Sequence, residues 1–373
     1  MSKVEIKGID SDVPSTLLRV DDIHKTFLTR SRGRKISTYA LRGVSFSIKK
    51  GESVGIVGES GCGKSTMARL IAGLDTPTRG SLQFLNRPMK FTKDLRRKIS
   101  MVFQDPYASL NPRMSTASCI REPMHLLSKN EIATKLEELY DEMPKKEWDK
   151  IPRGKIKTFF LKFESRRALA EKTYVAQLLE LVQLRPEWAV RYPHEFSGGQ
   201  KQRIGIARSL ATSPELLILD EPVSALDVSV QAGIISLLRK LKKDNQLSML
   251  FISHDLRVVK QVCDRVIVMY LGQIMEDAPS DMLFSKPRHP YTKALLDSIP
   301  RTKQSARDLK KEDSELLENS AFRVLEGEIP SPTNPPNGCP FRTRCEKASE
   351  ECLQSPQVAQ LTDGRFVACH FPY

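Results

Sequence analysis

Short apolar runs separated by amphipathic stretches recur along most of the chain, which predicts an α/β fold with a parallel sheet. Continuous apolar runs such as Leu216-Leu217-Ile218-Leu219 are typical of strands that are covered on both faces. Residues 17–27 and 39–48 are predicted as two further strands, joined by a basic turn at 30–35. The other strands that the pattern predicts are 53–57, 99–103, 216–219, 248–252 and 265–270.

Helices are predicted where apolar residues recur at spacings of three and four. The stretch 110–184 has this pattern, and within it residues 125–172 are dense in Lys and Glu and interrupted by prolines. We interpret 125–172 as an inserted helical excursion with a solvated charged face. After Pro330 the chain becomes rich in proline and cysteine, which predicts a small appended module. Other predicted helices are 67–72, 201–210, 228–243, one between 252 and 265, and two short ones within 279–299.

Composition narrows the class of protein only slightly. The chain has 373 residues, enough for two domains or for one large domain with an appendage. Its net charge of +14 can mark a nucleic-acid binder, a protein near anionic lipid, or simply a lysine-rich surface. The basic residues are spread out and are not interleaved with aromatics, so charge alone identifies no partner. No apolar run approaches the roughly 20 residues of a membrane-spanning helix, and the N-terminus lacks an apolar signal region, so we expect a cytosolic protein.

One glycine-rich segment is the first candidate for a binding site. It fits the G-x-x-x-x-G-K-[ST] phosphate-binding loop and lies between a predicted strand and a predicted helix. Lys64 is expected to reach the outer phosphates, and the hydroxyl of Ser65 is expected to hold Mg²⁺. The alternative is a glycine-rich turn without a ligand, but Lys-Ser in register favours binding of a nucleoside triphosphate. The segment consists of Gly58, Glu59, Ser60, Gly61, Cys62, Gly63, Lys64, Ser65 and Thr66.

Two acidic residues follow the most apolar strand directly. Asp220 stands where folds of this kind hold Mg²⁺, and Glu221 is suited to orient and deprotonate an attacking water. The alternative is a pair of acidic residues that merely end a strand.

A second glycine-rich segment comes before the helical run 201–210. Ser197 is a good N-cap, and Gly198, Gly199 and Gln200 bring a helix start, which favours anions, close to any ligand. One nucleotide could not easily use both glycine-rich segments of one subunit. We therefore expect this second surface to serve another chain.

Together these motifs resemble those of ATP-binding cassette (ABC) proteins. Phe196-Ser197-Gly198-Gly199-Gln200 is similar to the signature motif of that family and lies upstream of Asp220-Glu221, as the family requires. Three further segments resemble its glutamine loop, D-loop and switch histidine. They are Phe103-Gln104-Asp105-Pro106, Ser224-Ala225-Leu226-Asp227 and Ile252-Ser253-His254-Asp255.

The resemblance implies an α/β P-loop NTPase with a RecA-like core, an antiparallel β subdomain and a helical subdomain. On this basis residues 15–300 form the ATPase domain, 105–212 its helical subdomain, 301–329 a linker and 330–373 a cysteine-rich module. Gln104 is expected beside Mg²⁺ with Ser65 and Asp220, His254 at the γ-phosphate, and Asp227 with residues 197–200 at a nucleotide shared between two subunits. Either Phe27 or Tyr39 is the candidate to stack on adenine, and either could instead be a core aromatic.

The flanks of these motifs narrow the resemblance to the ATPase subunits of oligopeptide and dipeptide importers, with residues 200–208 more like the F-type subunit than its D-type partner. The segments that carry this are Asn111-Pro112-Arg113-Met114, Tyr192-Pro193-His194-Glu195, His289-Pro290-Tyr291-Thr292-Lys293-Ala294-Leu295 and the cysteine-bearing tail.

The implied partners are a D-type ATPase in a heterodimer, two transmembrane permease subunits and, through the complex, an extracytoplasmic peptide-binding protein, with no nucleic acid. The chain would then lie on the cytoplasmic face of the cell membrane, held by the permeases. Relatives also import nickel and glutathione. The long segment 125–172 departs from the family, whose members are usually shorter here, and it either modifies docking to the permeases or is a surface elaboration.

The last four cysteines form a separate candidate site, since seven cysteines in a cytosolic chain do not suggest a disulfide framework. Cys339, Cys345, Cys352 and Cys369 lack the paired C-x-x-C spacing of common zinc ribbons. They could close around a metal or remain unliganded thiols. Arg342, Arg344 and Lys347 are expected to help keep the thiols ionised. Their pattern resembles the tail of peptide-importer ATPases that carry a [4Fe–4S] cluster, with Zn²⁺ as the second choice.

Two other classes of protein remain as alternatives. One is a soluble cassette protein without a membrane partner, although neither a second cassette nor a long coiled coil is visible in the sequence. The other treats the cysteine tail as a metal-sensing module for which the ATPase is the switch.

Overall fold

The computed structural model describes residues 16–31, 34–105, 109–127, 131, 163–245, 247–299 and 327–373. Most of the predicted insertion 125–172 and of the predicted linker 301–329 lies outside the described residues. No helix within the described ranges is long and apolar enough to cross a membrane.

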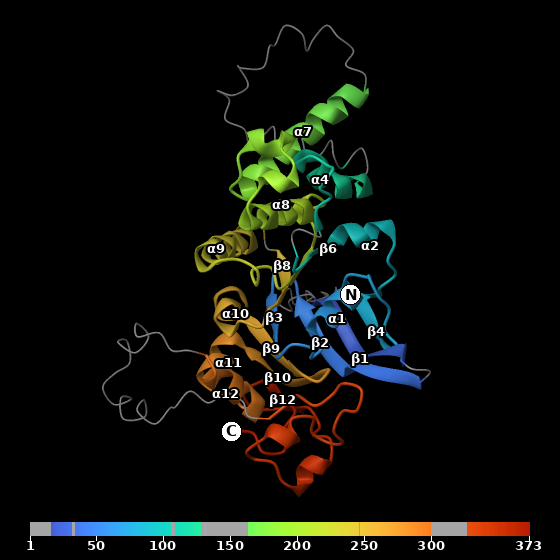
Figure 1. The fold of residues 1–373 in the computed structure, drawn as a ribbon, viewed down its shortest axis with the longest axis vertical. Coiled ribbons are helices and arrows are strands. Elements are labelled where there is room, and N and C mark those ends of the chain that lie inside the picture. Colours follow the sequence, from blue (N-terminus) through green and yellow to red (C-terminus); the bar gives the residue numbers. More distant parts are fainter. Residues whose placement is uncertain are drawn as a thin grey trace, which may run out of the picture.

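An eight-stranded sheet runs through the middle of the molecule in the order β11-β12-β10-β9-β3-β8-β7-β6 (Figure 1). The five strands from β9 to β6 are parallel, and all five were predicted from their apolar runs. They are β3 (Ser53–Val57), β6 (Ile99–Val102), β7 (Leu216–Asp220), β8 (Ser248–Ile252) and β9 (Arg265–Tyr270).

Strand β10 (Gln273–Pro279), which the apolar pattern did not predict, runs antiparallel to β9. Its centre holds two buried carboxylates, Glu276 and Asp277, which hide the strand from a search for apolar runs. Each carboxylate is paired: Asp277 accepts from Arg265, and Glu276 accepts from the backbone N–H groups of Arg288 and His289. Pairing of this kind is what allows charged groups to be buried.

A four-stranded antiparallel sheet, in the order β2-β1-β4-β5, lies beside the central sheet. Its two long strands pair as far as Ser31 and Arg34, so most of the predicted basic turn at 30–35 is strand. The strands continue to this point because β-branched residues near their ends, such as Thr29 and Ile36, favour strand structure. The strands are β1 (Thr16–Ser31), β2 (Arg34–Lys49), β4 (Arg79–Phe84) and β5 (Arg87–Pro88), of which β4 and β5 were not predicted.

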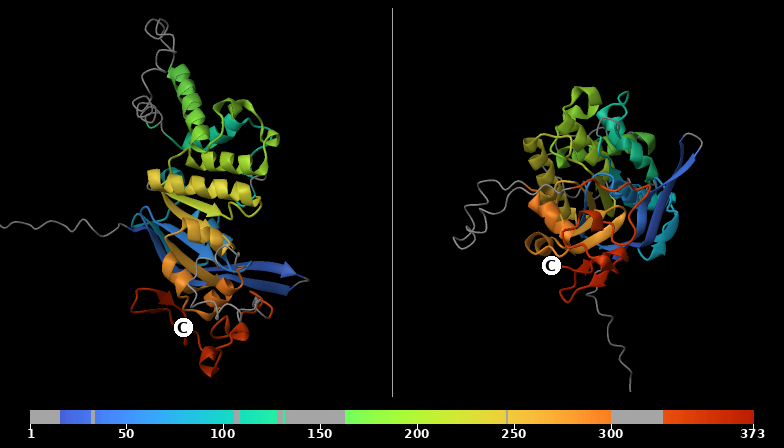
Figure 2. Two further views of the ribbon diagram at one scale, coloured as in Figure 1. Left: turned by 90° about the vertical axis from the view of Figure 1, so that its left-hand side faces the viewer. Right: turned by 60° about the horizontal axis from the view of Figure 1, so that its bottom comes forward.

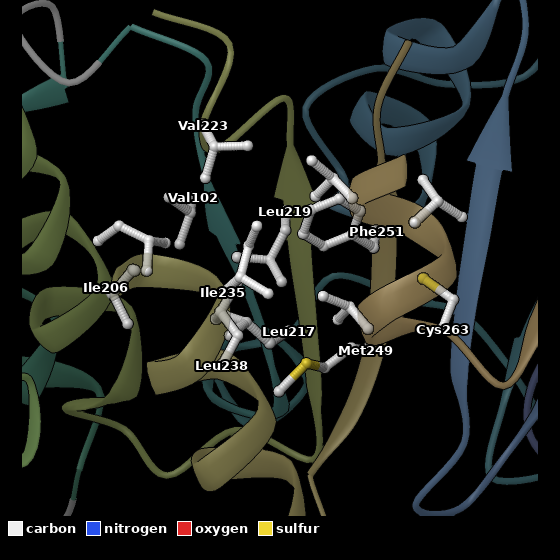
Figure 3. Close-up of a cluster of buried hydrophobic side chains, with 14 of the residues drawn as sticks. Val102, Ile206, Leu217, Leu219, Val223, Ile235, Leu238, Met249, Phe251 and Cys263 are labelled. Atoms are coloured by element: carbon white, nitrogen blue, oxygen red, sulfur yellow. The ribbon is translucent and has the colours of Figure 1, made fainter. Parts of the chain in front are cut away.

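Alternate residues of the parallel strands point into two different cores. Leu216 and Ile218 of β7 join the core between the two sheets, whereas Leu217 and Leu219 join the core beneath the helices. Figure 3 shows this second core, with Leu217 and Leu219 facing Ile235 and Leu238 of helix α9. Burial on both faces is the reason these strands read as continuous apolar runs.

Helices cover the central sheet and extend away from it at one end (Figures 1 and 2). Predicted helices that the structure confirms are α1 (Lys64–Ile71), α8 (Gly198–Leu210), α9 (Val228–Asn245), α10 (Leu256–Val262), α11 (Ser280–Ser285) and α12 (Pro290–Asp297). Within the predicted helical region are α4 (Thr116–Arg121), η1 (Glu122–Leu126) and α7 (Phe163–Leu181), and elsewhere α2 (Lys93–Lys98), η3 (Pro186–Val190) and η4 (Pro193–Glu195).

The C-terminal segment 327–373 lies at the opposite end from α4, α7 and α8 (Figure 1). It is built into the fold, because its strand β12 (Phe366–Val367) pairs with β10 and extends the central sheet. Cys339, Phe341 and Cys352 belong to the main core beneath the helices. The segment also contains η6 (Arg342–Arg344), η7 (Glu350–Leu353) and β11 (Ala359–Gln360).

Candidate functional site

The candidate site lies where the parallel strands end. Strands β3, β8, β7 and β6 are neighbours and point the same way, so the residues that follow each strand meet at one edge of the sheet. This edge carries a pocket. Its lining residues are Thr38, Ala40, Ser60, Gly61, Gly63, Lys64, Ser65, Thr66, Gln104, Glu221, His254 and Pro332.

The glycine-rich segment 58–66 wraps from β3 into helix α1. Gly63, with φ of 103°, precedes the helix in the left-handed region, and a Cβ at this position would lie 2.5 Å from the backbone oxygen of Ala40. Only glycine fits both requirements. No side chain caps the start of α1, so its first N–H groups face the pocket ready for an anion.

Lys64 brings a buried positive charge to the pocket, with only 5% of its surface exposed. Its Nζ donates to two backbone carbonyls of its own loop, those of Gly58 at 2.8 Å and Glu59 at 3.0 Å. Carbonyl dipoles compensate a buried ammonium only partly. The lysine is therefore suited to neutralise an anionic group that enters the pocket.

Ser65 and Asp220 meet although 155 positions separate them. The hydroxyl of Ser65 donates to Oδ1 of Asp220 at 3.0 Å, so both oxygens point to one place. Burial raises the pKa of the Asp220 carboxyl above its ordinary value, and the neighbouring Glu221 carboxylate raises it further. Two neighbouring carboxylates, one of them buried, favour a cation, and a hydroxyl with a carboxylate is a donor set that suits Mg²⁺.

Glu221 is the point at which three of the motifs converge. Its Oε2 accepts from Nε2 of Gln104 at 3.1 Å and lies 3.3 Å from Nδ1 of His254. Its backbone has φ of 46°, which is uncommon for a residue other than glycine, and its N–H is held by the carbonyl of Ile252 at 3.0 Å. The β8 strand thus fixes the orientation of a strained, partly exposed carboxylate.

Three lining residues were not predicted from the sequence: Thr38, Ala40 and Pro332. The first two come from β2, and Pro332 comes from the C-terminal segment. None carries a chemical group that a motif search would detect. The two aromatic candidates for adenine, Phe27 and Tyr39, do not line the pocket; they lie partly exposed on the paired strands β1 and β2.

The second glycine-rich segment begins helix α8 and does not contribute to the described lining of the pocket. Ser197 accepts from the backbone N–H of Gln200, and the side chain of Gln200 accepts from the N–H of Ser197, which forms a capping box. Gly199 is held against α9, because a Cβ there would lie 2.2 Å from Cγ1 of Val230.

Asp227 of the predicted D-loop likewise lies outside the lining of the pocket. Its carboxylate accepts from the hydroxyl of Ser229 and from the N–H of Val230, and these bonds lower its pKa below the ordinary value. Asp227 therefore shapes the start of α9 in this chain.

Comparison with known proteins agrees with this arrangement. The family model described as "ABC transporter" matches residues 41–224, which contain the phosphate loop, the signature segment and Asp220-Glu221. An oligopeptide transport ATP-binding protein of Bacillus subtilis, AppF, is 45% identical over 95% of this chain and 97% of its own length. The corresponding protein of Haemophilus influenzae, OppF, is 43% identical over 88% of each chain.

The chain belongs to the ABC transporter family. Within this family it groups with the oligopeptide transport ATP-binding proteins, and it is an ATPase. A solved ABC cassette, a dimer in a post-hydrolysis state with ADP and phosphate, matches 71% of this chain and 99% of its own with a TM-score of 0.54 and 27% identity. The cassette cbiO1 of Clostridium perfringens matches 73% of this chain and 91% of its own, also with a TM-score of 0.54, at 26% identity.

A second family model, "Oligopeptide/dipeptide transporter, C-terminal region", matches residues 275–352 of this ABC ATPase. It begins at β10 and includes three of the four tail cysteines. All four of these cysteines line one small cavity, together with residues such as Phe341 and His370. Among the described residues, no three His, Cys, Asp or Glu side chains are placed to hold one metal ion.

The pKa values of three tail thiols, Cys339, Cys345 and Cys369, are raised, contrary to the prediction that basic residues help to ionise them. Burial raises the pKa of Cys339 to about 11, and the nearby sulfurs of Cys352, Cys369 and Cys345 raise it as well. Burial also raises the pKa of Cys345 and Cys369, although Lys347 opposes this in part. The basic side chain next to Cys345, that of Arg344, turns away and pairs with Glu59.

Proposed function

We propose that this ATPase binds and hydrolyses ATP at a subunit interface to drive the import of oligopeptides or dipeptides. The observation that carries the proposal is the convergence of Gln104, His254 and Glu221 on one pocket with the phosphate loop. Relatives at 43–45% identity that are named oligopeptide transport ATP-binding proteins support the substrate class.

The hydrolytic step uses groups whose positions follow from the sheet. Phosphates would enter at the start of α1, where Lys64 exchanges its two carbonyl partners for phosphate oxygens. Ser65, Asp220 and Gln104 would hold Mg²⁺, which supplies charge neutralisation at the phosphates. Glu221 accepts a proton from the attacking water, and His254, beside it, contacts the γ-phosphate.

Residues 197–200 and Asp227 lie outside the pocket of their own chain, which supports a role for them at the site of a second subunit. We propose a D-type ATPase as that subunit, in a heterodimer bound to two permeases on the cytoplasmic face of the membrane. Gln104 joins the pocket to the helical part of the cassette and would transmit closure to the permeases. An extracytoplasmic binding protein would deliver the substrate.

Reconstitution tests the transport proposal. The chain would be purified with its partner ATPase and permeases, placed in liposomes, and assayed for ATP-dependent uptake of labelled di- and oligopeptides, nickel and glutathione. We expect uptake of peptides. Uptake of nickel or glutathione alone would show that the proposed substrate class is wrong. Robust hydrolysis with no association to any permease would favour a cassette protein that works without a membrane partner.

We propose further that residues 330–373, joined by a linker to the ATPase domain 15–300, hold a [4Fe–4S] cluster. The support is the chemistry of the donors, since Cys339, Cys345, Cys352 and Cys369 face one cavity and a cation would offset the cost of ionising their buried thiols. ATP hydrolysis needs no redox centre, so the role of the cluster is structural or regulatory.

Anaerobic purification with iron, sulfide and zinc analysis tests the cluster. We expect iron and sulfide in equal amounts, lost in the Cys345→Ser variant and retained in Cys263→Ser, whose thiol is buried in the ATPase core. Zinc without iron would identify a structural metal, and absence of both would leave four reduced thiols.

A further inference from the structure

The C-terminal segment contacts the candidate site at two points, one in the pocket and one on the phosphate loop. The carbonyl of Pro332 accepts from the backbone N–H of Tyr39 at 3.0 Å, and Pro332 itself lines the pocket. Farther along, Arg344 contacts the phosphate loop, 285 positions away in the sequence. The tail is thus part of the wall of the nucleotide site as well as an extension of the sheet.

Arg344 makes a two-pronged ion pair with Glu59. Its Nη1 lies 2.7 Å from Oε2 of Glu59, and its Nη2 lies 3.1 Å from Oε1. Only 4% of the arginine side chain and 21% of the glutamate side chain are exposed. A bidentate pair with so little exposure is geometrically specific and hardly screened by solvent.

Glu59 is the second residue of the phosphate loop, and its side chain, N–H and carbonyl each have a partner. Its side chain is held by Arg344, its N–H donates to Oη of Tyr291 at 3.0 Å, and its carbonyl accepts from Lys64 at 3.0 Å. The same carbonyl also accepts from the N–H of Cys62 within the loop at 3.3 Å, and this contact stays when Lys64 turns to phosphate. The two remaining contacts from outside the loop, with Arg344 and Tyr291, then keep it in place.

Both remaining contacts depend on one aromatic cluster. Tyr270 of β9, Tyr291 of α12 and Phe341 of the tail pack with ring centroids 4.7 to 5.4 Å apart. Nη1 of Arg344 also donates to Oη of Tyr270 at 3.3 Å. The position of the arginine is therefore set by the packing of the tail on the core.

Charge gives the pair a second effect. Glu59 directly precedes Ser60, which lines the pocket where phosphates are expected. A free carboxylate at this place would repel a polyphosphate, and Arg344 neutralises it.

We propose that Arg344 is a positioning residue for nucleotide binding, through which the C-terminal segment holds and neutralises Glu59 of the phosphate loop. The tail then forms part of the ATP site even though it contains none of the cassette motifs. Because coupling between sites is reciprocal, bound nucleotide must in turn stabilise the tail.

Calorimetric titration of the full-length chain with Mg-ADP tests the proposal. The Arg344→Met variant keeps an unbranched side chain in the core, and we expect its Kd for ADP to rise about tenfold, a typical size for coupling between sites. Adding Glu59→Gln to this variant removes the exposed charge and is expected to restore most of the affinity. Arg344→Lys keeps the positive charge but loses the two-pronged contact, so its Kd for ADP is expected to lie between those of the unmodified chain and Arg344→Met.

Arg342→Met is the matched control. Arg342 lies on the same turn, and its Nε donates to the carbonyl of Asn337 and makes no contact with the loop that the structure records. We expect its Kd to be that of the unmodified chain. An unchanged Kd in Arg344→Met, or a loss of affinity that Glu59→Gln does not relieve, would overturn the proposal.

Hydrogen exchange gives a second test, because an arginine with a purely structural role would not make exchange in the tail depend on ADP. We expect ADP to slow exchange of the backbone amides of 339–345 in the unmodified chain by several-fold, and not in Arg344→Met. Equal exchange with and without ADP in the unmodified chain would show that the tail and the nucleotide are not coupled.

Discussion

Two helices of this ATPase begin at glycine-rich segments, and they begin in different ways. Helix α1 follows Gly63 without any side-chain cap, so its first N–H groups remain available. Helix α8 is closed by its own residues, with Ser197 and Gln200 bonded to each other's backbone. The first helix start is open to an anion, and the pocket there is lined by Lys64 and Ser65, by residues of β2, and by residues that follow β6, β7 and β8.

The second helix start is already satisfied within the chain and lies away from the pocket. A ligand from another subunit would have to compete with its capping box or add to it. The difference shows that a glycine-rich helix start is not by itself a nucleotide site, because the neighbouring strand ends supply the charges and the metal ligands.

The largest expected effect comes from Glu221, which lines the pocket at the start of α1 and not the start of α8. We expect Glu221→Gln in the assembled complex to lower kcat by at least about 100-fold, the usual contribution of a general base, while ATP binding is retained. Steady-state phosphate release and nucleotide titration measure the two quantities. Glu215→Gln, at a carboxylate paired with Lys98 at the other end of β7, is the control and should hydrolyse normally. Normal hydrolysis by Glu221→Gln would refute the assignment of the base.

A third helix start, that of α12, is expected to make the stability of the protein depend on pH. His289 caps α12 by accepting the N–H of Tyr291 on Nδ1, and burial lowers its pKa to about 4. Between pH 4 and its ordinary pKa near 6.5 the unfolded chain binds more protons than the folded chain, so stability falls as pH falls through this range. The full effect of this one group is about 3 kcal/mol, at 1.36 kcal/mol for each unit of pKa.

Chemical denaturation between pH 4 and 7 measures this dependence. His289→Asn keeps a side chain that can cap a helix but does not titrate, so its stability should fall less steeply with acid. The same slope in both proteins would mean that the acid response comes from other groups.

Gly63→Ala tests how the open helix start is built. The added Cβ meets the backbone oxygen of Ala40 in a left-handed conformation, so the loop must shift. Strain of this kind costs on the order of 1–3 kcal/mol, and we expect affinity for ADP to fall about tenfold or more. Gly205→Ala, within α8 and with open space around its Cβ position, should leave affinity unchanged. Equal affinities would show that the loop adapts freely.

Ser197→Ala should produce the smallest change in the isolated chain. Loss of an N-cap costs about 1 kcal/mol, measured by denaturation, and affinity for ADP should not change because this helix start lies outside the pocket. Ser197→Asn should restore stability. If Ser197→Ala weakened ADP binding in the isolated chain, the contrast between the two helix starts would fail.

Sequence reasoning predicted the parallel strands well, because burial on both faces leaves a continuous apolar run that few other structures produce. It missed β10, whose buried carboxylates Glu276 and Asp277 read as surface. It also treated residues after Pro330 as an appendage, although β12 continues the central sheet. A two-residue strand carries no periodicity from which it could be predicted.

The chemistry of the site was readable from local patterns. Lys64 and Ser65 begin the helix that follows β3, whereas Asp220 ends β7 and Glu221 follows it. Parallel strands bring such positions together regardless of their distance in sequence. The rest of the pocket lining could not be predicted from the sequence. Thr38, Ala40 and Pro332 line the pocket only because distant segments pack there.

The sequence by itself determined the class of fold, the phosphate loop and the acidic pair, because short-range spacing specifies strand, turn and helix start. Only the tertiary structure decided that Gln104 and His254 share one oxygen of Glu221 and that Arg344 of the tail holds Glu59. Such pairs depend on which strands become neighbours and how side chains pack between them. No local pattern records an ion pair formed across 285 positions of chain.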